Sequence, residues 1–428
     1  MKKQISSLLS MLLVFQMMAR PVSRQEAMKA AQRFLYIRGI KSSVLKEGGH
    51  TPMTKTSEDS DGSAYYIFNV GNNDGFVVIS GDDRTDAVLG YSTSGEFDEA
   101  TIPDNMRAWL QGYADQINST RSYTRVLDSV DLHDPIKPLL TTKWGQDEPY
   151  NNKCPENNDS LCATGCAATA LAQVLNYYRY PKDLPAIKGY TTTTNKIIVD
   201  SRPEIKDFNW DALKATYSKE DDDENIATLM LYCGQSMKMD YRPQSSSADD
   251  YMAAVALCNV FNYASAENAW RSQYSAKGWD ELIYRELSNK NPVLYCGDSS
   301  GGAHTFVCDG YDGYGYYHIN WGWEGDKDSY FLLSALNSDG GGTGASTTND
   351  GYNFGQNAII NVKTTGKPEI EIKTGIKSFR YVSEEKQLYI YHKNNLSNKY
   401  NFDLGIGYLT DESIVFFKHF NSCECAPN

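Results

Sequence analysis

Apolar side chains recur along this chain with two different spacings, which separate helical segments from strands. Positions 64–80 alternate between apolar and polar residues, which predicts two strands around a turn at 71–75. Ser23, with Glu26 three residues later, has the pattern of a capping box at the start of a helix. Spacings of three and four residues predict helices over 23–36, 103–117, 166–178, 223–232, 248–261 and 279–288.

The pattern changes to short strand-like runs after the last of these helices. Residues 293–362 alternate apolar runs with turns and predict a β-rich half. From about residue 364, short alternating runs at 370–372, 388–391 and 402–406 predict a small β segment. Only about 60 residues remain for it, fewer than the roughly 100 of a complete immunoglobulin-like sandwich. It is therefore either a small module or an incomplete, truncated sandwich module.

The first residues have the pattern of an export signal. Lys2 and Lys3 precede an apolar run from Ile5 to Met18. This run is shorter than the ~20 residues that span a bilayer, and it fits the apolar core of a signal peptide. The pattern predicts a signal peptide over residues 1–19, a secreted protein and no transmembrane segment. A buried helix is the alternative interpretation.

Composition and charge argue against several classes of function. The chain has 428 residues, enough for two or three domains. It carries 41 basic and 54 acidic residues, for a net charge of −13, and has no basic block, which argues against binding to nucleic acid or anionic membranes. It contains no Cys-x-x-Cys and no His-Glu-x-x-His pattern, so we expect neither a metal nor another cofactor. The sequence leaves the oligomeric state open.

Cys166, His304 and Asn320 form a spaced set typical of a thiol protease. Cys166 begins the predicted helix at 166–178, and the other two follow roughly 140 and 150 residues later, close to the spacing in papain-like enzymes. A free thiol of pKa about 8.5 is mostly protonated at neutral pH. The helix dipole and an imidazolium from His304 would convert Cys166 to a thiolate nucleophile. Asn320 would orient that imidazole, as the third member of a triad does.

Two more residues complete the expected site, and a third is a rival for the nucleophile. The oxyanion needs donors placed in advance, and the backbone N–H of Cys166 and the side-chain amide of Gln146 are the candidates. Trp321 would cover the hydrogen bond between His304 and Asn320 and keep water away. Cys162 lies only four residues before Cys166 and is a second candidate thiol.

The other cysteines allow several states. Cys154 and Cys162 can pair across a short loop, and Cys423 and Cys425 at the chain end can reach another chain. All of them can equally remain thiols. Cys166 itself must stay free and accessible to catalyse.

These segments resemble the streptopain family of secreted bacterial cysteine proteases, and among its members those of the Bacteroides and Prevotella type, such as interpain. One departure is Gly165, where streptopain carries histidine. The segments that carry the resemblance are 164–181 (the nucleophile helix), 302–310 (the histidine strand), 317–323 (the Asn/Trp segment), 144–151 (the oxyanion-hole glutamine) and 76–98 (the prosegment).

The resemblance implies an α+β fold, with a papain-like catalytic domain made of a helical half and a β half. An α+β prosegment would precede this domain and a small β segment would follow it. The implied boundaries are a signal peptide at 1–19, an inhibitory prosegment at 20–130, the catalytic domain at 131–363 and the C-terminal segment at 364–428. Cleavage is expected in the polar linker at about 120–134.

The expected function is that of a secreted cysteine endopeptidase made as a zymogen, with proteins or peptides as substrates. Its own prosegment would act as an intramolecular inhibitor that blocks or misplaces His304, and removal of the prosegment would activate the enzyme. Tyr295–Ser299 and the 340–355 loop are candidates for the substrate pocket. Two alternatives on the same fold are a non-proteolytic adhesin or binding protein, and an acyl transferase.

Overall fold

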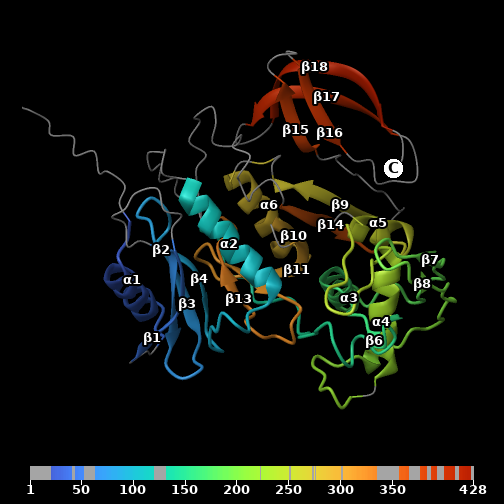
Figure 1. Ribbon diagram of the computed structural model, residues 1–428, viewed down its shortest axis with the longest axis horizontal. Helices are drawn as coiled ribbons and strands as arrows, with labels where there is room; N and C mark the ends of the chain where they lie inside the picture. Colours follow the sequence, from blue (N-terminus) through green and yellow to red (C-terminus); the bar gives the residue numbers. More distant parts are fainter. Residues whose placement is uncertain are drawn as a thin grey trace, which may run out of the picture.

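The computed structural model of the chain describes most of residues 21–365 and four strands beyond them (Figure 1). The expected signal peptide, the linker at 120–131 and the loop at 340–355 lie outside the described residues. The described ranges are 21–40, 44–52, 63–119, 132–221, 223–249, 252–271, 276–299, 302–334 and 356–365, with residue 274 and the strands between 376 and 425.

The N-terminal region forms a small α+β unit, as its pattern predicts. Its first helix begins at Ser23, whose side chain accepts from the N–H of Glu26 while the Glu26 carboxylate accepts from the N–H of Ser23. The predicted capping box is therefore confirmed. The predicted turn at 71–75 is confirmed too, because β2 and β3 pair on either side of it. The elements are α1 (Arg24–Ile37), β1 (Leu45–Pro52), β2 (Ser63–Val70), β3 (Phe76–Ser80), β4 (Val88–Ser92) and α2 (Asp104–Ser119).

The middle of the chain contains a helical part followed by a β part. The helical part consists of α3 (Cys166–Tyr178), α4 (Glu224–Ser236) and α5 (Met252–Asn259), with the 3-10 helix η2 (Trp210–Ala212) and two short hairpins, β5 (Glu156–Asn157) with β6 (Ser160–Leu161) and β7 (Tyr190–Thr191) with β8 (Ile198–Val199). The β part consists of β9 (Ser265–Trp270), α6 (Ala276–Ser288), β10 (Val293–Ser299), β11 (Gly302–Tyr311), β12 (Tyr317–Asn320), β13 (Ser329–Phe331) and β14 (Asn357–Lys363).

One antiparallel sheet joins the N-terminal region to the β part. Its order is β1-β2-β3-β4-β13-β12-β11-β10-β14-β9. The junction is a short pairing of β4 with β13, in which Tyr91 lies opposite Tyr330 and Gly90 opposite Phe331. Figure 1 shows the blue N-terminal strands continuing into the orange strand β13. The N-terminal region is thus built onto the edge of the sheet that carries His304.

The two faces of the β part contact different helices. Side chains alternate along a strand, and Val307 of β11 belongs to the core that contains α3, whereas Phe306 belongs to the core that contains α2. The same alternation occurs in β10 between Leu294 and Tyr295. The sheet therefore lies between the helix that begins at Cys166 and the helix α2 of the N-terminal region.

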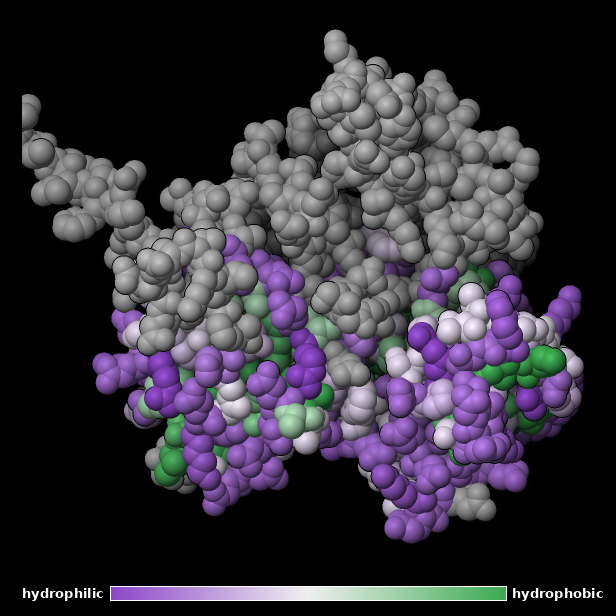
Figure 2. Space-filling model, viewed as in Figure 1, coloured by the Kyte–Doolittle hydropathy of each residue, from purple (hydrophilic) through white to green (hydrophobic). Residues whose placement is uncertain are grey.

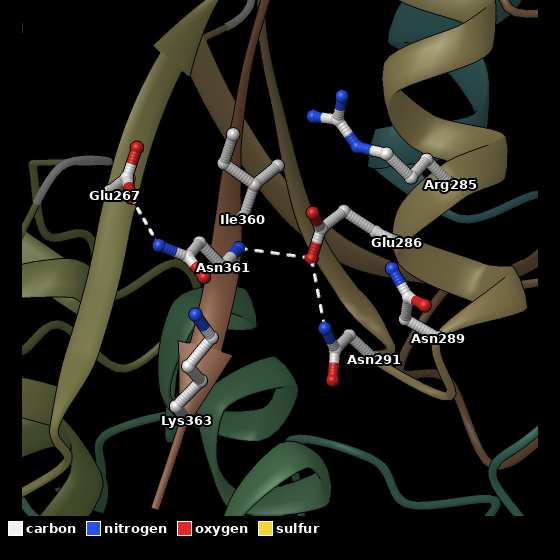
Figure 3. Close-up of a pocket in the computed structure, with 8 residues that line it drawn as sticks. All are labelled: Glu267, Arg285, Glu286, Asn289, Asn291, Ile360, Asn361 and Lys363. Carbon is white, nitrogen blue, oxygen red and sulfur yellow. Dashed lines mark hydrogen bonds between the residues drawn. The ribbon is translucent and has the colours of Figure 1, made fainter. Parts of the chain in front are cut away.

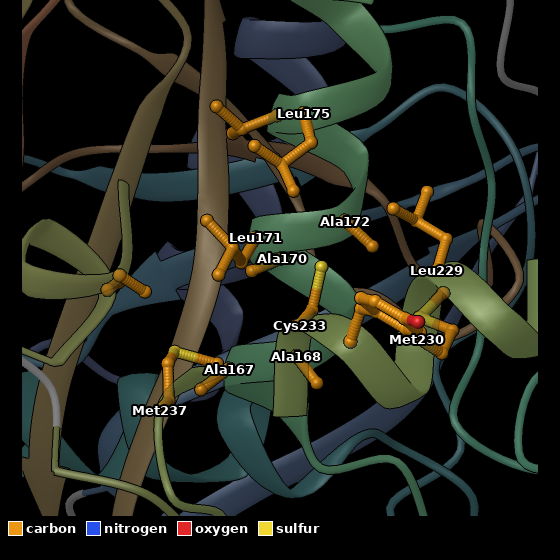
Figure 4. Close-up of a cluster of buried hydrophobic side chains, with 14 of the residues drawn as sticks. Ala167, Ala168, Ala170, Leu171, Ala172, Leu175, Leu229, Met230, Cys233 and Met237 are labelled. Carbon is orange, nitrogen blue, oxygen red and sulfur yellow. The ribbon is translucent and has the colours of Figure 1, made fainter. Parts of the chain in front are cut away.

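Small side chains allow α3 to pack closely inside the helical part. Alanines at 167, 168, 170 and 172 are buried, and Leu171 and Leu175 fill the space toward the sheet (Figure 4). Leu229, Met230 and Cys233 of α4 lie against the same helix. This packing fixes where the first turn of α3, and hence Cys166, is held.

Several element boundaries differ from the sequence prediction. Helix α4 extends four residues beyond the predicted end at 232, and α5 covers only the middle of the predicted segment 248–261. The sequence analysis did not predict strands β1 and β4. Strand β1 has weak strand character, because it contains two glycines, Lys46 and Pro52, and it lies at the sheet edge.

Two antiparallel hairpins follow, pairing β15 (Ile376–Val382) with β16 (Gln387–His392) and β17 (Tyr400–Leu409) with β18 (Ile414–Cys425). Strands β16 and β17 confirm the β runs predicted at 388–391 and 402–406, while 370–372 lies outside the described residues.

The surface of the described residues is mostly hydrophilic on the face drawn in Figure 2, with small hydrophobic areas. Large apolar residues such as Ile198 and Tyr314 are exposed singly. Among the described helices, none has both the length and the apolar character needed to cross a membrane.

Candidate active site

Cys166 is the first residue of α3, and among the seven cysteines from Cys154 to Cys308 it alone is not buried. The residue before it, Gly165, has φ of +87°, and a Cβ there would lie 2.9 Å from the carbonyl oxygen of Ser246. Only glycine fits this position without strain. The N–H of Cys166 lies in the first helical turn, where α-helical hydrogen bonding leaves it available.

Cys162 has a different environment from Cys166. It is fully buried, and this burial raises the pKa of its thiol to about 11. A buried thiol with a raised pKa supplies almost no thiolate at neutral pH. Cys154 is buried too, and burial together with the charge of Cys162 raises its pKa. The structure therefore favours Cys166 over Cys162 as the reactive cysteine.

Strand β11, which carries His304, contacts the thiol of Cys166 through the next residue, Thr305. The backbone N–H of Thr305 donates to the Cys166 Sγ at 3.4 Å, so the histidine adjoins a residue in direct contact with the thiol. His304 is partly exposed. On the neighbouring strand, Cys296 Sγ lies 3.5 Å from Thr305 Oγ1. The two chain segments that carry Cys166 and His304 are thus in contact.

Asn320 ends β12 and is held by α3, the helix that begins at Cys166. Its amide pairs reciprocally with that of Gln173, with both N–O distances at 3.1 Å. Asn320 Nδ2 also donates to the Thr142 carbonyl at 2.9 Å, and its Oδ1 accepts from the N–H of Gly322 at 3.0 Å. The side chain of Asn320 is therefore held by several groups that the sequence did not predict.

Gln173 is a residue whose importance sequence reasoning missed. It is fully buried within a helix of small apolar residues, and it accepts from Thr142 Oγ1 at 2.7 Å. A buried amide needs partners, and Gln173 lies two turns after Cys166 on the same side of the helix. The sequence shows a lone amide among small apolar residues and its spacing of seven residues from Cys166, and these two signals could have identified it.

Gln146 lies beside the approach to the nucleophile helix. Its backbone carbonyl accepts from the N–H of Thr164 at 3.1 Å. Thr169 Oγ1 donates to the carbonyl of Gly145 at 3.1 Å and lies 3.0 Å from Thr164 Oγ1. These bonds tie the 144–146 segment to both sides of Cys166. The side chain of Gln146 is partly exposed.

Trp321 is fully buried in an aromatic cluster. Its ring centroid lies 4.9 Å from that of Phe306 and 6.3 Å from that of Trp109 in α2. Asn105, one turn before Trp109, donates from Nδ2 to the Trp321 carbonyl at 2.6 Å. Helix α2 of the N-terminal region therefore packs directly on the segment that follows Asn320.

A buried group of titratable residues supports the same segment from another side. Asp309 is fully buried, accepts from the N–H of Leu140 at 2.8 Å and bonds His318 at 2.6 Å. Burial lowers the pKa of His318, but the hydrogen bond to Asp309 and its charge outweigh this and raise the pKa overall. Asp328 accepts from the Trp321 N–H at 3.0 Å, and burial raises its pKa to about 6.

We predict that Asp328→Asn makes stability less dependent on pH between about 4 and 6. The folded-state pKa is raised above the unfolded value of about 3.9, so the native state holds this proton more tightly, and ionisation costs up to about 3 kcal/mol as pH rises through this range. Asparagine keeps an acceptor for Trp321 without titrating. Denaturant unfolding across this pH range, in a chain lacking the reactive thiol, measures the effect.

Asp326→Asn is the matched control, because Asp326 is exposed and should leave the pH profile unchanged. Burial also raises the pKa of Asp280 to about 6, so the stability of the Asp328 variant should still depend partly on pH in this range. Identical profiles for the wild type and Asp328→Asn would contradict the prediction.

A pocket of about 470 Å³ lies away from these residues, between α6, β9 and β14 (Figure 3). Glu286 accepts there from the backbone N–H of Asn361 at 3.0 Å and from Asn291 Nδ2 at 3.1 Å, and Asn361 also bonds Glu267. None of the predicted catalytic residues lines the pocket. Its hydrogen bonds hold the end of β14 against α6, which is a structural role.

Comparisons with known proteins cover both the N-terminal region and the site. A family model described as "Peptidase C10 family" matches residues 144–331, and one described as "Spi protease inhibitor" matches 19–117. Streptopain of Streptococcus pyogenes serotype M28 (strain MGAS6180) is 33% identical over 372 residues, which are 80% of this chain and 92% of streptopain. The thiol protease/hemagglutinin PrtT of Porphyromonas gingivalis is 30% identical over 369 residues, 81% of this chain and 42% of PrtT.

Solved structures give a similar result. A fragment of prointerpain A from Prevotella intermedia superposes with a TM-score of 0.60 at 28% identity, covering 76% of this chain and all of that fragment. This structural match therefore extends beyond residues 144–331, the part of the chain that the peptidase family model covers.

Proposed function

Because this chain belongs to the peptidase C10 (streptopain) family of cysteine peptidases and resembles a zymogen, prointerpain A, we propose that it is a secreted endopeptidase that uses Cys166 as its nucleophile. The observation that supports this most directly is the hydrogen bond from the Thr305 N–H to the Cys166 Sγ, because it puts the histidine-bearing strand against the one cysteine between Cys154 and Cys308 that is not buried.

The proposed reaction follows the chemistry of a thiolate–imidazolium pair. The Cys166 thiolate attacks the carbonyl carbon of the scissile peptide bond, and the resulting oxyanion accepts hydrogen bonds from the Cys166 N–H and the Gln146 side chain. As the C–N bond breaks, His304 gives its proton to the leaving amine. His304 then takes a proton from water, and the hydroxide cleaves the thioester and releases the second product.

Asn320 would orient His304 in the active form, with Trp321 covering that bond. In the chain described here the Asn320 amide bonds Gln173, Thr142 and Gly322. We infer that these bonds hold Asn320 in the position from which its amide orients His304, while α2 contacts the next residue, Trp321, through Asn105. Gln173 would then be a positioning residue that sets how far Asn320 can move.

The N-terminal region, residues 20–130, would be the inhibitory prosegment, and 131–363 the catalytic domain. Support comes from the inhibitor model that matches 19–117 and from the continuous sheet through β4 and β13. Cleavage in the linker at 120–134 would release the prosegment and activate the enzyme. The 364–428 segment would be a separate β module.

Secretion is proposed from the signal-like pattern at residues 1–19 and from the family. Substrates would be proteins or peptides. Within the expected pocket segment Tyr295–Ser299, Cys296 lies beside Thr305, but Tyr295 and Cys296 are fully buried and would support this segment rather than contact the substrate. Residues 340–355, the other pocket candidate, lie outside the described residues.

Gln146→Ala is expected to lower kcat by roughly 100- to 1000-fold with a smaller change in KM, because it removes one oxyanion donor that acts mainly in the transition state. Steady-state hydrolysis of a small peptide amide by the processed enzyme measures this. The exposed neighbour Asp147 gives the control Asp147→Asn, which should change kcat little. A pure KM effect in the Gln146 variant would assign it to substrate binding instead.

Intact-mass labelling with an irreversible epoxide inhibitor of papain-like enzymes tests the proposed function as a whole. We expect one adduct on Cys166 in the wild type and none in Cys166→Ala. An adduct on Cys162 would overturn the nucleophile assignment. Failure of the processed enzyme to react or to cut casein would favour the binding-protein alternative, and transfer of the acyl group to added amines would favour an acyl transferase.

A further inference from the structure

Arg38 connects the N-terminal region to the turn between β11 and β12. This residue caps the C-terminus of α1, and its Nη2 donates to the Oδ2 of Asp312 at 2.8 Å. Both side chains are largely buried, with 14% and 5% of their surface exposed. An ion pair this far removed from solvent is screened little by salt and depends strongly on geometry.

Four aromatic rings surround the guanidinium. Its Cζ lies 4.0 Å from the ring centroid of Tyr314 and 5.6 Å from that of Tyr316, both on the β11–β12 turn. Phe34 and Tyr91 of the N-terminal region approach to 5.0 and 5.2 Å. Aromatic faces attract a cation, and a planar guanidinium stacks on them better than an ammonium.

The carboxylate of Asp312 is positioned by the turn itself. Its Oδ1 accepts from the backbone N–H groups of Tyr314 at 2.7 Å and Tyr316 at 3.1 Å. The Asp312 N–H donates to the Tyr316 carbonyl at 3.0 Å. These bonds lie within the turn and position the Asp312 carboxylate without Arg38, although Oδ2 also accepts from Tyr91 Oη at 2.9 Å and Tyr316 Oη donates to the Val88 carbonyl at 3.1 Å.

We propose that the turn from Asp312 to Tyr316 is a guanidinium-binding site of the peptidase region, which Arg38 occupies here and by which the N-terminal region is anchored. This rests on the proposed role of residues 20–130 as a detachable prosegment. Once that region leaves, the site would accept another arginine side chain, because the Asp312 carboxylate and the rings of Tyr314 and Tyr316 stay with the peptidase region.

The test uses the full chain carrying Cys166→Ala, so that its outcome does not depend on peptidase activity. Arg38→Ala should lower the melting temperature by at least about 2 °C, and millimolar ethylguanidinium should restore more than half of the loss by filling the vacated site. Ethylammonium at the same concentration should restore little. Arg33→Ala, an exposed arginine of the same helix, should behave as wild type.

Asp312→Asn in the Arg38→Ala chain separates the site from a general effect of the cation. It removes the charge but retains an acceptor for the turn, and we expect it to abolish the rescue. Equal rescue with and without Asp312, or no loss of melting temperature in Arg38→Ala, overturns the proposal. If the alanine variant does not fold, Arg38→Lys gives the same comparison, since the ammonium cannot reproduce the stacked geometry.

A second readout keeps this proposal distinct from the proposed function. In chains that retain Cys166, Arg38→Ala should shorten the time before casein hydrolysis begins. If ethylguanidinium restores the melting temperature but activation is not faster, the guanidinium site is supported. The proposal that residues 20–130 keep the enzyme latent would then be contradicted.

Discussion

Replacing Cys166 by alanine is expected to abolish peptide hydrolysis, with kcat reduced at least about 10⁴-fold, because no other group at the first turn of α3 can form the acyl-enzyme. The residual rate would come from the oxyanion donors and substrate binding alone. Processing must be made equal before rates are compared. Both chains would be cut at the linker with an added serine protease, which is then inhibited, and casein hydrolysis is followed afterwards.

Cys162→Ala is the matched control for this experiment. The two cysteines are four residues apart, yet Cys162 is fully buried and its thiol has a raised pKa, whereas Cys166 is partly exposed. We expect the Cys162 variant to keep its activity within a few-fold of wild type. Normal activity in Cys166→Ala, together with a large loss in Cys162→Ala, would reverse the assignment and with it the proposed role of the α3 N-terminus.

Local features of the chain were predictable because local interactions determine them. The box formed by Ser23 and Glu26 begins α1, and Gly165 ends the preceding loop so that α3 starts at Cys166. The strong helix pattern of residues 166–178 reproduces the bounds of α3 in full. The two strands around 71–75 follow from alternation and a glycine-rich turn.

Contacts between distant segments were not predictable in the same way. The pairing of β4 with β13 depends on a register between residues about 240 positions apart, and neither strand carries a distinctive pattern. The bonds of Asn320 to Gln173 and Thr142 arise only when α3 and β12 are packed together. Arg38 and Asp312 are ordinary charged residues in sequence, and only the fold surrounds them with four rings.

Family resemblance gave the proposed catalytic residues, but it did not give the packing around them. The spacing of Cys166, His304 and Asn320 indicates a thiol peptidase in which the amide serves the imidazole. The structure adds that this amide is bonded to groups on α3 and the 142 segment. Helix α2 packs on Trp321, the residue after Asn320, so the N-terminal region contacts the same segment.

Trp109 is the residue through which this packing can be tested most strongly. Its indole is almost fully buried, and it contacts the rings of Phe306 at 5.6 Å, Tyr295 at 5.7 Å and Trp321 at 6.3 Å. Phe306 belongs to the strand that carries His304, Trp321 follows Asn320, and Tyr295 belongs to the expected pocket segment. Trp109 itself belongs to the part of the chain that would be removed on activation.

Trp109→Ala is therefore expected to shorten latency while leaving the processed enzyme unchanged. Truncating a buried tryptophan typically costs about 3–5 kcal/mol, which corresponds to a roughly 100-fold or larger increase in the population with α2 undocked. Undocking of α2 frees Trp321, so activity should appear sooner in freshly purified chain. The lag before casein hydrolysis, measured as a function of time, reports this directly.

Gln111→Ala on the exposed face of the same helix provides the control, since Gln111 bonds only Asp115 one turn later at 2.8 Å among the described contacts. It should keep the wild-type lag. After complete processing, the wild type and both variants should have equal kcat, because the substituted residues leave with the N-terminal region. A shortened lag with reduced final activity would mean that Trp109 is needed to fold the peptidase region. An unchanged lag would mean that α2 does not hold the latent form.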